Sequence, residues 1–84
     1  MSISPKALRV DFDPQQMWVH LEDGRTLGVP LAWFPRLAHA TPDQLGQVMI
    51  SSRGLHWEEI DEDISIAGLI AGRGDMTGAH SRAA

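Results

Sequence analysis

Histidine and carboxylate side chains are the residues of this 84-residue sequence that could carry acid–base chemistry. His56 precedes Glu58 by two positions and Asp61 by five. If this segment is a strand, His56 and Glu58 point to the same side, because side chains alternate along a strand. An imidazole held beside a carboxylate can act as a general base. These residues define one hypothesis, a small enzyme or ligand-binding protein.

The surroundings of these residues favour a different role. Acid–base catalysis needs a pocket that pulls two pKa values apart, and a domain this short rarely encloses one without a second subunit. The carboxylates between Glu58 and Asp63 are typical of a solvated acidic face. The sequence does not decide whether the protein is an enzyme, but we favour a non-enzymatic role and assign no catalytic residue.

The sequence contains fragments of metal- and cofactor-binding motifs, but none of these motifs is complete. Residues 61–65 (DEDIS) start like an EF-hand calcium loop, yet Ile66 stands where glycine is needed and Gly72 where glutamate is needed. The four histidines are not spaced as a zinc pair, and there is no cysteine. Residues 72–75 (GRGD) follow a predicted helix and not a strand, which disfavours a phosphate loop. We expect no metal, no cofactor and no residue that binds one.

Composition and charge limit the kind of partner. Hydrophobic residues make up 43% of the chain and charged residues 21%, as in ordinary folded domains. Eleven acidic residues against seven basic ones give a formal charge of −4. Because phosphate contacts dominate nucleic-acid affinity, we expect no direct nucleic-acid binding and favour a protein partner. No apolar run is long enough to cross a membrane, and no signal-peptide pattern opens the sequence, so we expect a cytoplasmic protein.

The first half of the chain has the pattern of an antiparallel sheet. Apolar and polar residues alternate over 7–12, 17–22 and 25–30, and Asp23-Gly24 is a strong hairpin signal. These segments predict a three-stranded meander. Its first strand should turn Leu8, Val10 and Phe12 to one face. In the second strand Met17, Val19 and Leu21 should face one way, with Trp18 and His20 on the other side.

The second half predicts short helices and a further strand pair. Trp33, Phe34 and Leu37 fit a helical segment that caps the sheet, and Thr41-Pro42-Asp43-Gln44 reads as a helix start with a capping box. Residues 48–50 and 55–57 predict paired strands around a turn at 52–54. The acidic residues 61–63 should precede a helix over 64–71, capped by Ser65 or Asp63.

These elements together predict an α+β fold. It consists of a three-stranded antiparallel meander, a C-terminal hairpin or strand pair, and two or three short helices. We expect one domain over residues 1–74, followed by a flexible tail over residues 75–84.

Exposed aromatic and charged positions suggest where a partner would bind. Trp18 is predicted on the sheet face opposite Met17, Val19 and Leu21, so either a helix or a partner must cover it. The predicted interaction surface consists of Trp18, His20, His56, Trp57, Asp61 and Asp63.

The motif Leu55-His56-Trp57, followed by residues 60–65 (IDEDIS), Gly68-Leu69 and Ala71-Gly72, resembles the C-terminal signature of a small bacterial family, domain of unknown function 2442. The Asp23-Gly24 hairpin and the aromatic segment around Trp33 are similar to its N-terminal half. The resemblance implies a compact α+β domain without established catalytic residues. It implies two contexts: fusion to a DNA-binding helix-turn-helix domain, which this sequence lacks, and a neighbouring gene for another small protein, as in toxin–antitoxin pairs.

The function that these observations favour is a small protein-interaction or regulatory module, with a neighbouring small protein as one candidate partner. A DNA-associated accessory that acts through a partner or as a homodimer is the first alternative. The small enzyme or ligand-binding protein is the second. A homodimer is open in each case, because an exposed sheet edge could pair two chains.

Overall fold

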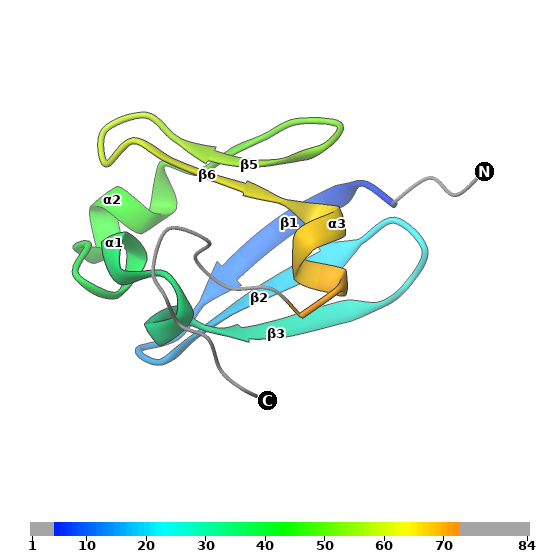
Figure 1. Cartoon of the computed structure of the whole chain (residues 1–84), viewed down its shortest axis with the longest axis horizontal. Coiled ribbons are helices and arrows are strands. Elements are labelled where there is room, and N and C mark those ends of the chain that lie inside the picture. Colours follow the sequence, from blue (N-terminus) through cyan, green and yellow to red (C-terminus); the bar gives the residue numbers. More distant parts are fainter. Residues whose placement is uncertain (1–4, 73–84) are drawn as a thin grey trace.

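The computed structural model describes residues 5–72, which form two three-stranded antiparallel sheets joined by short helical segments (Figure 1). Sheet A has the order β1-β2-β3 and sheet B the order β4-β5-β6. The strands are β1 (Ala7–Phe12), β2 (Gln16–Leu21), β3 (Thr26–Pro30), β4 (Met49–Ile50), β5 (Gly54–Trp57) and β6 (Glu62–Ser65). The helical segments are η1 (Leu31–Trp33), α1 (Pro35–Ala38), α2 (Pro42–Gly46) and α3 (Ile66–Ile70). This arrangement confirms the predicted α+β fold class.

Sheet A is the predicted meander, and local turn chemistry explains its two reversals. The Asp13 carboxylate accepts hydrogen bonds from the backbone N–H groups of Gln15 and Gln16, which fixes the β1–β2 turn. Gly24 has φ 96° in the β2–β3 hairpin, a conformation that favours glycine. Met17, Val19 and Leu21 are buried on the inner face as predicted.

Strand β1 departs from the predicted alternation at its start. Ala7 pairs with Leu21 and Arg9 pairs with His20, so the register shifts between Ala7 and Arg9 and leaves Leu8 as an extra residue. Leu8 is 65% exposed, and Ala7 takes the inner position. The expectation that Leu8 shares the inner face with Val10 and Phe12 was therefore wrong, because a bulge reverses the alternation.

The connection between the sheets is helical, as expected. Thr41 caps α2 with a complete capping box: its hydroxyl accepts from the Gln44 N–H at 3.1 Å, and the Gln44 side chain accepts from the Thr41 N–H at 2.9 Å. Phe34 and Leu37 are buried in the core, whereas Trp33 is 40% exposed.

Sheet B contains one strand more than the sequence pattern predicts. Glu62–Ser65 forms β6, and α3 begins at Ile66, two residues later than the predicted helix start. Ser65 caps α3, since its hydroxyl accepts from the Gly68 N–H at 2.8 Å. Asp61 and Asp63 therefore do not lie at a helix start: Asp61 ends the β5–β6 turn, and Asp63 pairs with His56 across the sheet.

The core lies between the inner faces of the two sheets. It joins Met17, Val19 and Val29 of sheet A to Leu55, Trp57 and Ile64 of sheet B, with buried residues of the helical segments around them. Each sheet consequently has an outer face on which its exposed side chains gather. No helix within residues 5–72 is long and apolar enough to cross a membrane. The expected tail over residues 75–84 lies outside the described residues.

Candidate functional site

The structure divides the predicted interaction surface between two faces and removes one member from it. Trp18 and His20 lie on the outer face of sheet A, and His56 and Asp63 on the outer face of sheet B. Trp57 is only 1% exposed, and its indole N–H donates to the Leu45 carbonyl at 3.1 Å. The prediction that Trp57 belongs to a surface was therefore wrong: this residue ties β5 to α2 in the core.

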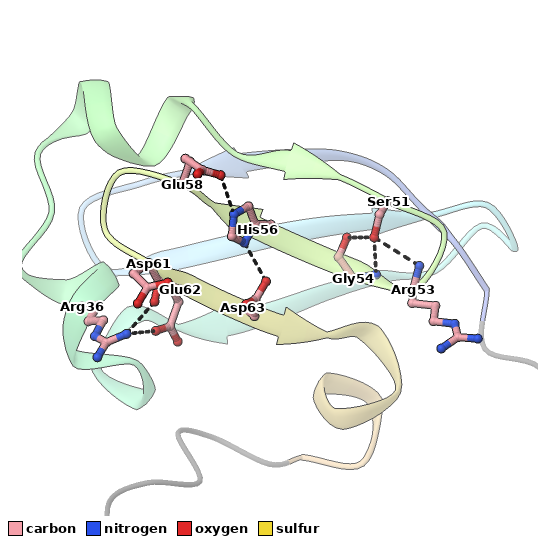
Figure 2. A network of polar contacts seen from close by, with 9 residues as sticks. All are labelled: Arg36, Ser51, Arg53, Gly54, His56, Glu58, Asp61, Glu62 and Asp63. Carbon is pink, nitrogen blue, oxygen red and sulfur yellow. Dashed lines mark hydrogen bonds and ion pairs between the residues drawn. The ribbon is translucent and has the colours of Figure 1, made fainter.

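On sheet B the imidazole of His56 lies between two carboxylates (Figure 2). Its Nδ1 is 2.6 Å from Oδ1 of Asp63, and its Nε2 is 3.0 Å from Oε1 of Glu58. Ionised carboxylates only accept hydrogen bonds, so both ring nitrogens must carry a proton for the two bonds to form together. The hydrogen bonds that His56 donates to Glu58 and then to Asp63 raise the pKa of His56 above its usual value.

Glu58 lies beside His56 as predicted, but it reaches the imidazole from the turn after β5, and the geometry does not form a general base. A general base needs a free ring nitrogen directed at the substrate, whereas both nitrogens of His56 face carboxylates. The arrangement is an ion-pair cluster that links β5 to β6.

Asp61 is not part of the His56 cluster. It has φ 55° at the end of the β5–β6 turn, a backbone conformation that aspartate tolerates better than most residues. Its carbonyl accepts a hydrogen bond from the Arg36 guanidinium, which also lies 3.7 Å from the Glu62 carboxylate (Figure 2). These contacts tie the turn to α1, and Asp61 contributes to them through its backbone carbonyl.

On sheet A the indole of Trp18 is held at two opposite edges. Its Nε1–H donates to Oδ2 of Asp13 at 2.9 Å. At the other edge, Cζ3 occupies the space above Gly28: a Cβ added there would lie 2.5 Å from it. The ring therefore lies across β2 from the β1–β2 turn toward β3. The Trp18 hydrogen bond, and then those of the Gln15 and Gln16 N–H groups, lower the pKa of Asp13.

A second polar group lies beside Trp18 on the same face. Nε2 of His20 is 2.8 Å from Oδ2 of Asp11, and Nδ1 is 3.2 Å from the Thr26 hydroxyl. The Arg9 Nε lies 3.3 Å from the same Asp11 oxygen. The hydrogen bond of His20 is the main cause that lowers the pKa of Asp11. Asp11 pairs with Trp18 across the strands, so the two residues are neighbours on the outer face of sheet A.

Sequence reasoning found Trp18 and His20 but missed the residues that hold them. Asp11, Asp13 and Gly28 were assigned only to strands or turns. The signal that could have found Asp11 is strand register, because the short β1–β2 turn fixes which residue of β1 lies opposite Trp18. No comparable signal exists for Gly28, since its role is to leave space for a ring on another strand.

Metal binding finds no support in this part of the chain. Across residues 5–72 no group of three or more His, Cys, Asp or Glu side chains could hold a metal ion. The two histidine clusters use their nitrogens for bonds to neighbouring carboxylates and to a hydroxyl.

The fold and its outer faces define a small α+β protein of two antiparallel sheets, with polar clusters on both outer faces. The model of the protein family of unknown function DUF2442 matches residues 7–75, and the chain belongs to this family. The resemblance inferred from residues 55–72 is thereby confirmed.

Two solved structures share this fold. A crystal structure of a protein of unknown function from Rhodospirillum rubrum is 37% identical, with 84% of this chain and 90% of that chain covered and a TM-score of 0.73. A solution structure of an uncharacterised protein from Chromobacterium violaceum is 27% identical, with 83% and 68% covered and a TM-score of 0.72. Comparison with curated proteins gives no match.

Proposed function

We propose that this protein is a protein-interaction module and that its partner binds the outer face of sheet A around Trp18. The observation that carries this proposal is the state of the Trp18 side chain. The residue is 37% exposed although its only polar atom, the indole nitrogen, already donates to Asp13. Trp18 therefore presents the apolar surface of its ring to a partner in a fixed orientation.

Such a side chain suits binding on energetic grounds. Tryptophan is enriched among the residues that dominate interface energies. A partner that covers a flexible side chain loses free energy by ordering it. Trp18 avoids much of this cost, because Asp13 and Gly28 hold its two edges before binding. Trp57 shows the contrasting arrangement of a core tryptophan in the same chain.

The charge of the chain supports a basic protein as the partner. A formal charge of −4 repels nucleic-acid phosphates and attracts a basic protein surface. The lack of cysteine fits a reducing compartment, and we place this role in the cytoplasm. Because the family resemblance implies a neighbouring gene for another small protein, the product of such a gene is the first partner to test.

The test compares three forms of the tagged protein: wild type, Trp18→Ala and Met49→Ala. Met49 is the matched control, because it is 53% exposed but lies on sheet B. Each form is used to capture proteins from native lysate at low and high salt. The captured partner is then purified and its affinity measured by calorimetry.

We expect Trp18→Ala to weaken the partner's affinity by about tenfold or more, and Met49→Ala to change it by less than about twofold. Circular dichroism establishes that both variants are folded. Equal affinity of the partner for wild type and Trp18→Ala would refute the proposed surface. Sedimentation distinguishes a second copy of this chain from a different partner.

A further inference from the structure

We propose that the group received by Trp18 is an arginine side chain of the partner protein, with its guanidinium packed on the indole and hydrogen-bonded to the oxygen atoms around it. This inference rests on the proposed function and names the chemistry of the same surface. Three features of sheet A lead to it: the ring, the oxygens beside it, and the charge of those oxygens.

The ring is the first feature. Tryptophan is the aromatic side chain that attracts cations most strongly, because the face of its ring carries negative electrostatic potential. Trp18 cannot offer a further hydrogen bond, since its Nε1–H is 2.9 Å from Asp13 Oδ2. Its exposed surface can therefore interact through the ring alone.

The oxygens beside the ring are the second feature. Asp11 is the cross-strand partner of Trp18, and its side chain is 52% exposed. Arg9 and His20 both contact its Oδ2, while its Oδ1 has no hydrogen-bond partner among residues 5–72. At the other edge of the ring, the amide oxygen of Gln16 lies 3.1 Å from the position that a Gly28 Cβ would take. Acceptors thus lie at two edges of the ring, Asp13 Oδ2 at the indole nitrogen and the Gln16 amide oxygen near Gly28, with Asp11 on the neighbouring strand.

The charge of these acceptors is the third feature. The pKa values of Asp11 and Asp13 are both lowered, so both carboxylates are ionised at neutral pH. A cation that approaches the ring therefore meets the negative charge of Asp13 at the indole nitrogen, while the charge of Asp11 is shared with Arg9. Arg9 already places a guanidinium nitrogen 3.3 Å from Oδ2 of Asp11, so an incoming arginine would share this carboxylate with Arg9 through its Oδ1.

Arginine fits these features better than lysine does. A guanidinium is planar, stacks on aromatic faces and carries five N–H donors, whereas an ammonium is a compact and strongly hydrated charge. An exposed aromatic ring with acceptors at two edges uses both the plane and the donors. A neutral apolar side chain would cover the ring but leave the Asp11 oxygen without a donor.

The experiment uses the full-length chain labelled with ¹⁵N and follows its indole N–H resonances during titration with end-blocked triarginine. Tricitrulline is the control probe, because citrulline keeps the shape and most donors of arginine but has no charge. Trilysine tests the preference for a guanidinium. The Trp18 resonance is assigned with a Trp18→Phe variant.

We expect triarginine to shift the Trp18 indole resonance and the backbone resonances of Asp11 and Gly28. Tricitrulline should bind about three- to tenfold more weakly, as expected from loss of an exposed cation–π contact and an ion pair. Trp18→Leu and Asp11→Asn should weaken the binding of triarginine, and Asp63→Asn on sheet B should leave it unchanged. Gly28→Ala, which retains Trp18 but pushes its ring aside, should also weaken it.

Equal affinity for triarginine and tricitrulline would overturn the inference, as would shifts confined to residues 58–63, which indicate general attraction to the acidic turn. A competition assay separates this inference from the proposed function. A partner that requires Trp18 but is not displaced by triarginine leaves the interaction surface standing and refutes its preference for arginine. Triarginine that binds at Trp18 when no partner requires this residue supports the arginine site and refutes the proposed function.

Discussion

His56 and Asp63 lie directly opposite each other on β5 and β6, and the Nδ1 of the imidazole is 2.6 Å from the Asp63 carboxylate. Glu58 contacts the other ring nitrogen at 3.0 Å. No titratable side chain of β4 faces this ring, because Met49 is its cross-strand neighbour there. The charge state of His56 is therefore governed by these two carboxylates.

The first prediction concerns the pH dependence of stability. The folded-state pKa of His56 is raised, so the folded protein binds this proton more tightly than the unfolded chain does. The stabilisation is complete below the unfolded pKa of about 6.5 and is lost as the pH rises through the folded pKa. We expect the free energy of unfolding to fall over this range less steeply in His56→Gln than in wild type, as measured by urea denaturation.

His39→Gln is the control for this experiment, because His39 is exposed and its side chain makes no hydrogen bond or ion pair with residues 5–72. This variant should retain the wild-type slope. An NMR titration of the imidazole gives the pKa of His56 directly, and Asp63→Asn should lower it. An unchanged slope in His56→Gln would show that the cluster contributes nothing to folding.

The second prediction concerns Gly54, where two strands approach too closely for a side chain. A Cβ at this position would lie 2.3 Å from the carbonyl oxygen of Ile64, which belongs to the neighbouring backbone. Because backbone atoms cannot rotate away, we expect Gly54→Ala to destabilise the fold by about 2 kcal/mol or more. Chemical denaturation measures this change.

Gly46→Ala is the matched control, because a Cβ there meets no atom within 4 Å. It lies in helix α2, where alanine is preferred to glycine, so we expect it to stabilise the protein by about 0.5 kcal/mol. Equal effects of the two substitutions would show that β5 and β6 separate without cost.

The contrast between local turn and cap signals and strand β6 shows how far the sequence predicts this fold. The meander and the capping box follow from local chemistry, so Asp23-Gly24 and Thr41 could be assigned from their neighbours alone. The cap of the last helix was left open between Ser65 and Asp63, and the structure selects Ser65. Strand β6 was missed because acidic residues before an apolar run also fit a helix start. What decides between the two is the pairing of 62–65 with β5, a contact between segments that local patterns do not encode.

The third prediction concerns the buried Trp57. Its indole N–H donates a hydrogen bond to the Leu45 carbonyl, and its ring is buried in the core. Trp57→Phe leaves a cavity and a carbonyl without its donor, so we expect a loss of about 2–4 kcal/mol in the free energy of unfolding. Trp33→Phe, at a residue that is 40% exposed, should change it by less than about 0.5 kcal/mol. Similar losses in both variants would contradict this assignment of core and surface.

The candidate site was predictable only in part, and Trp18 illustrates the limit. Strand alternation placed it opposite Met17 and Val19, which the structure confirms. Alternation treats every outward residue alike, so it grouped Trp18 with His56 although they lie on different sheets. Trp57 was grouped with the surface residues although alternation turns it away from its outward neighbour His56; the structure buries it between the sheets and beside α2.

The last prediction concerns the bond between Asp13 and Trp18. The indole N–H is the main cause that holds the pKa of Asp13 below its ordinary value, and the N–H groups of Gln15 and Gln16 add to it. In Trp18→Phe the ring remains but its donor is lost, so we expect the pKa of Asp13 to rise toward its ordinary value. A ¹³C NMR titration of the carboxyl group measures this change.

The same bond has a consequence for acid stability. A lowered folded-state pKa stabilises the protein above the unfolded pKa of about 3.9, and this contribution is lost as the pH falls through the folded pKa. Trp18→Phe should therefore lose less stability on acidification than wild type, whereas Trp33→Phe should behave like wild type. If Asp13 has the same pKa with and without the indole nitrogen, Trp18 is not fixed by this bond. Trp18 would then not present a preordered surface to a partner.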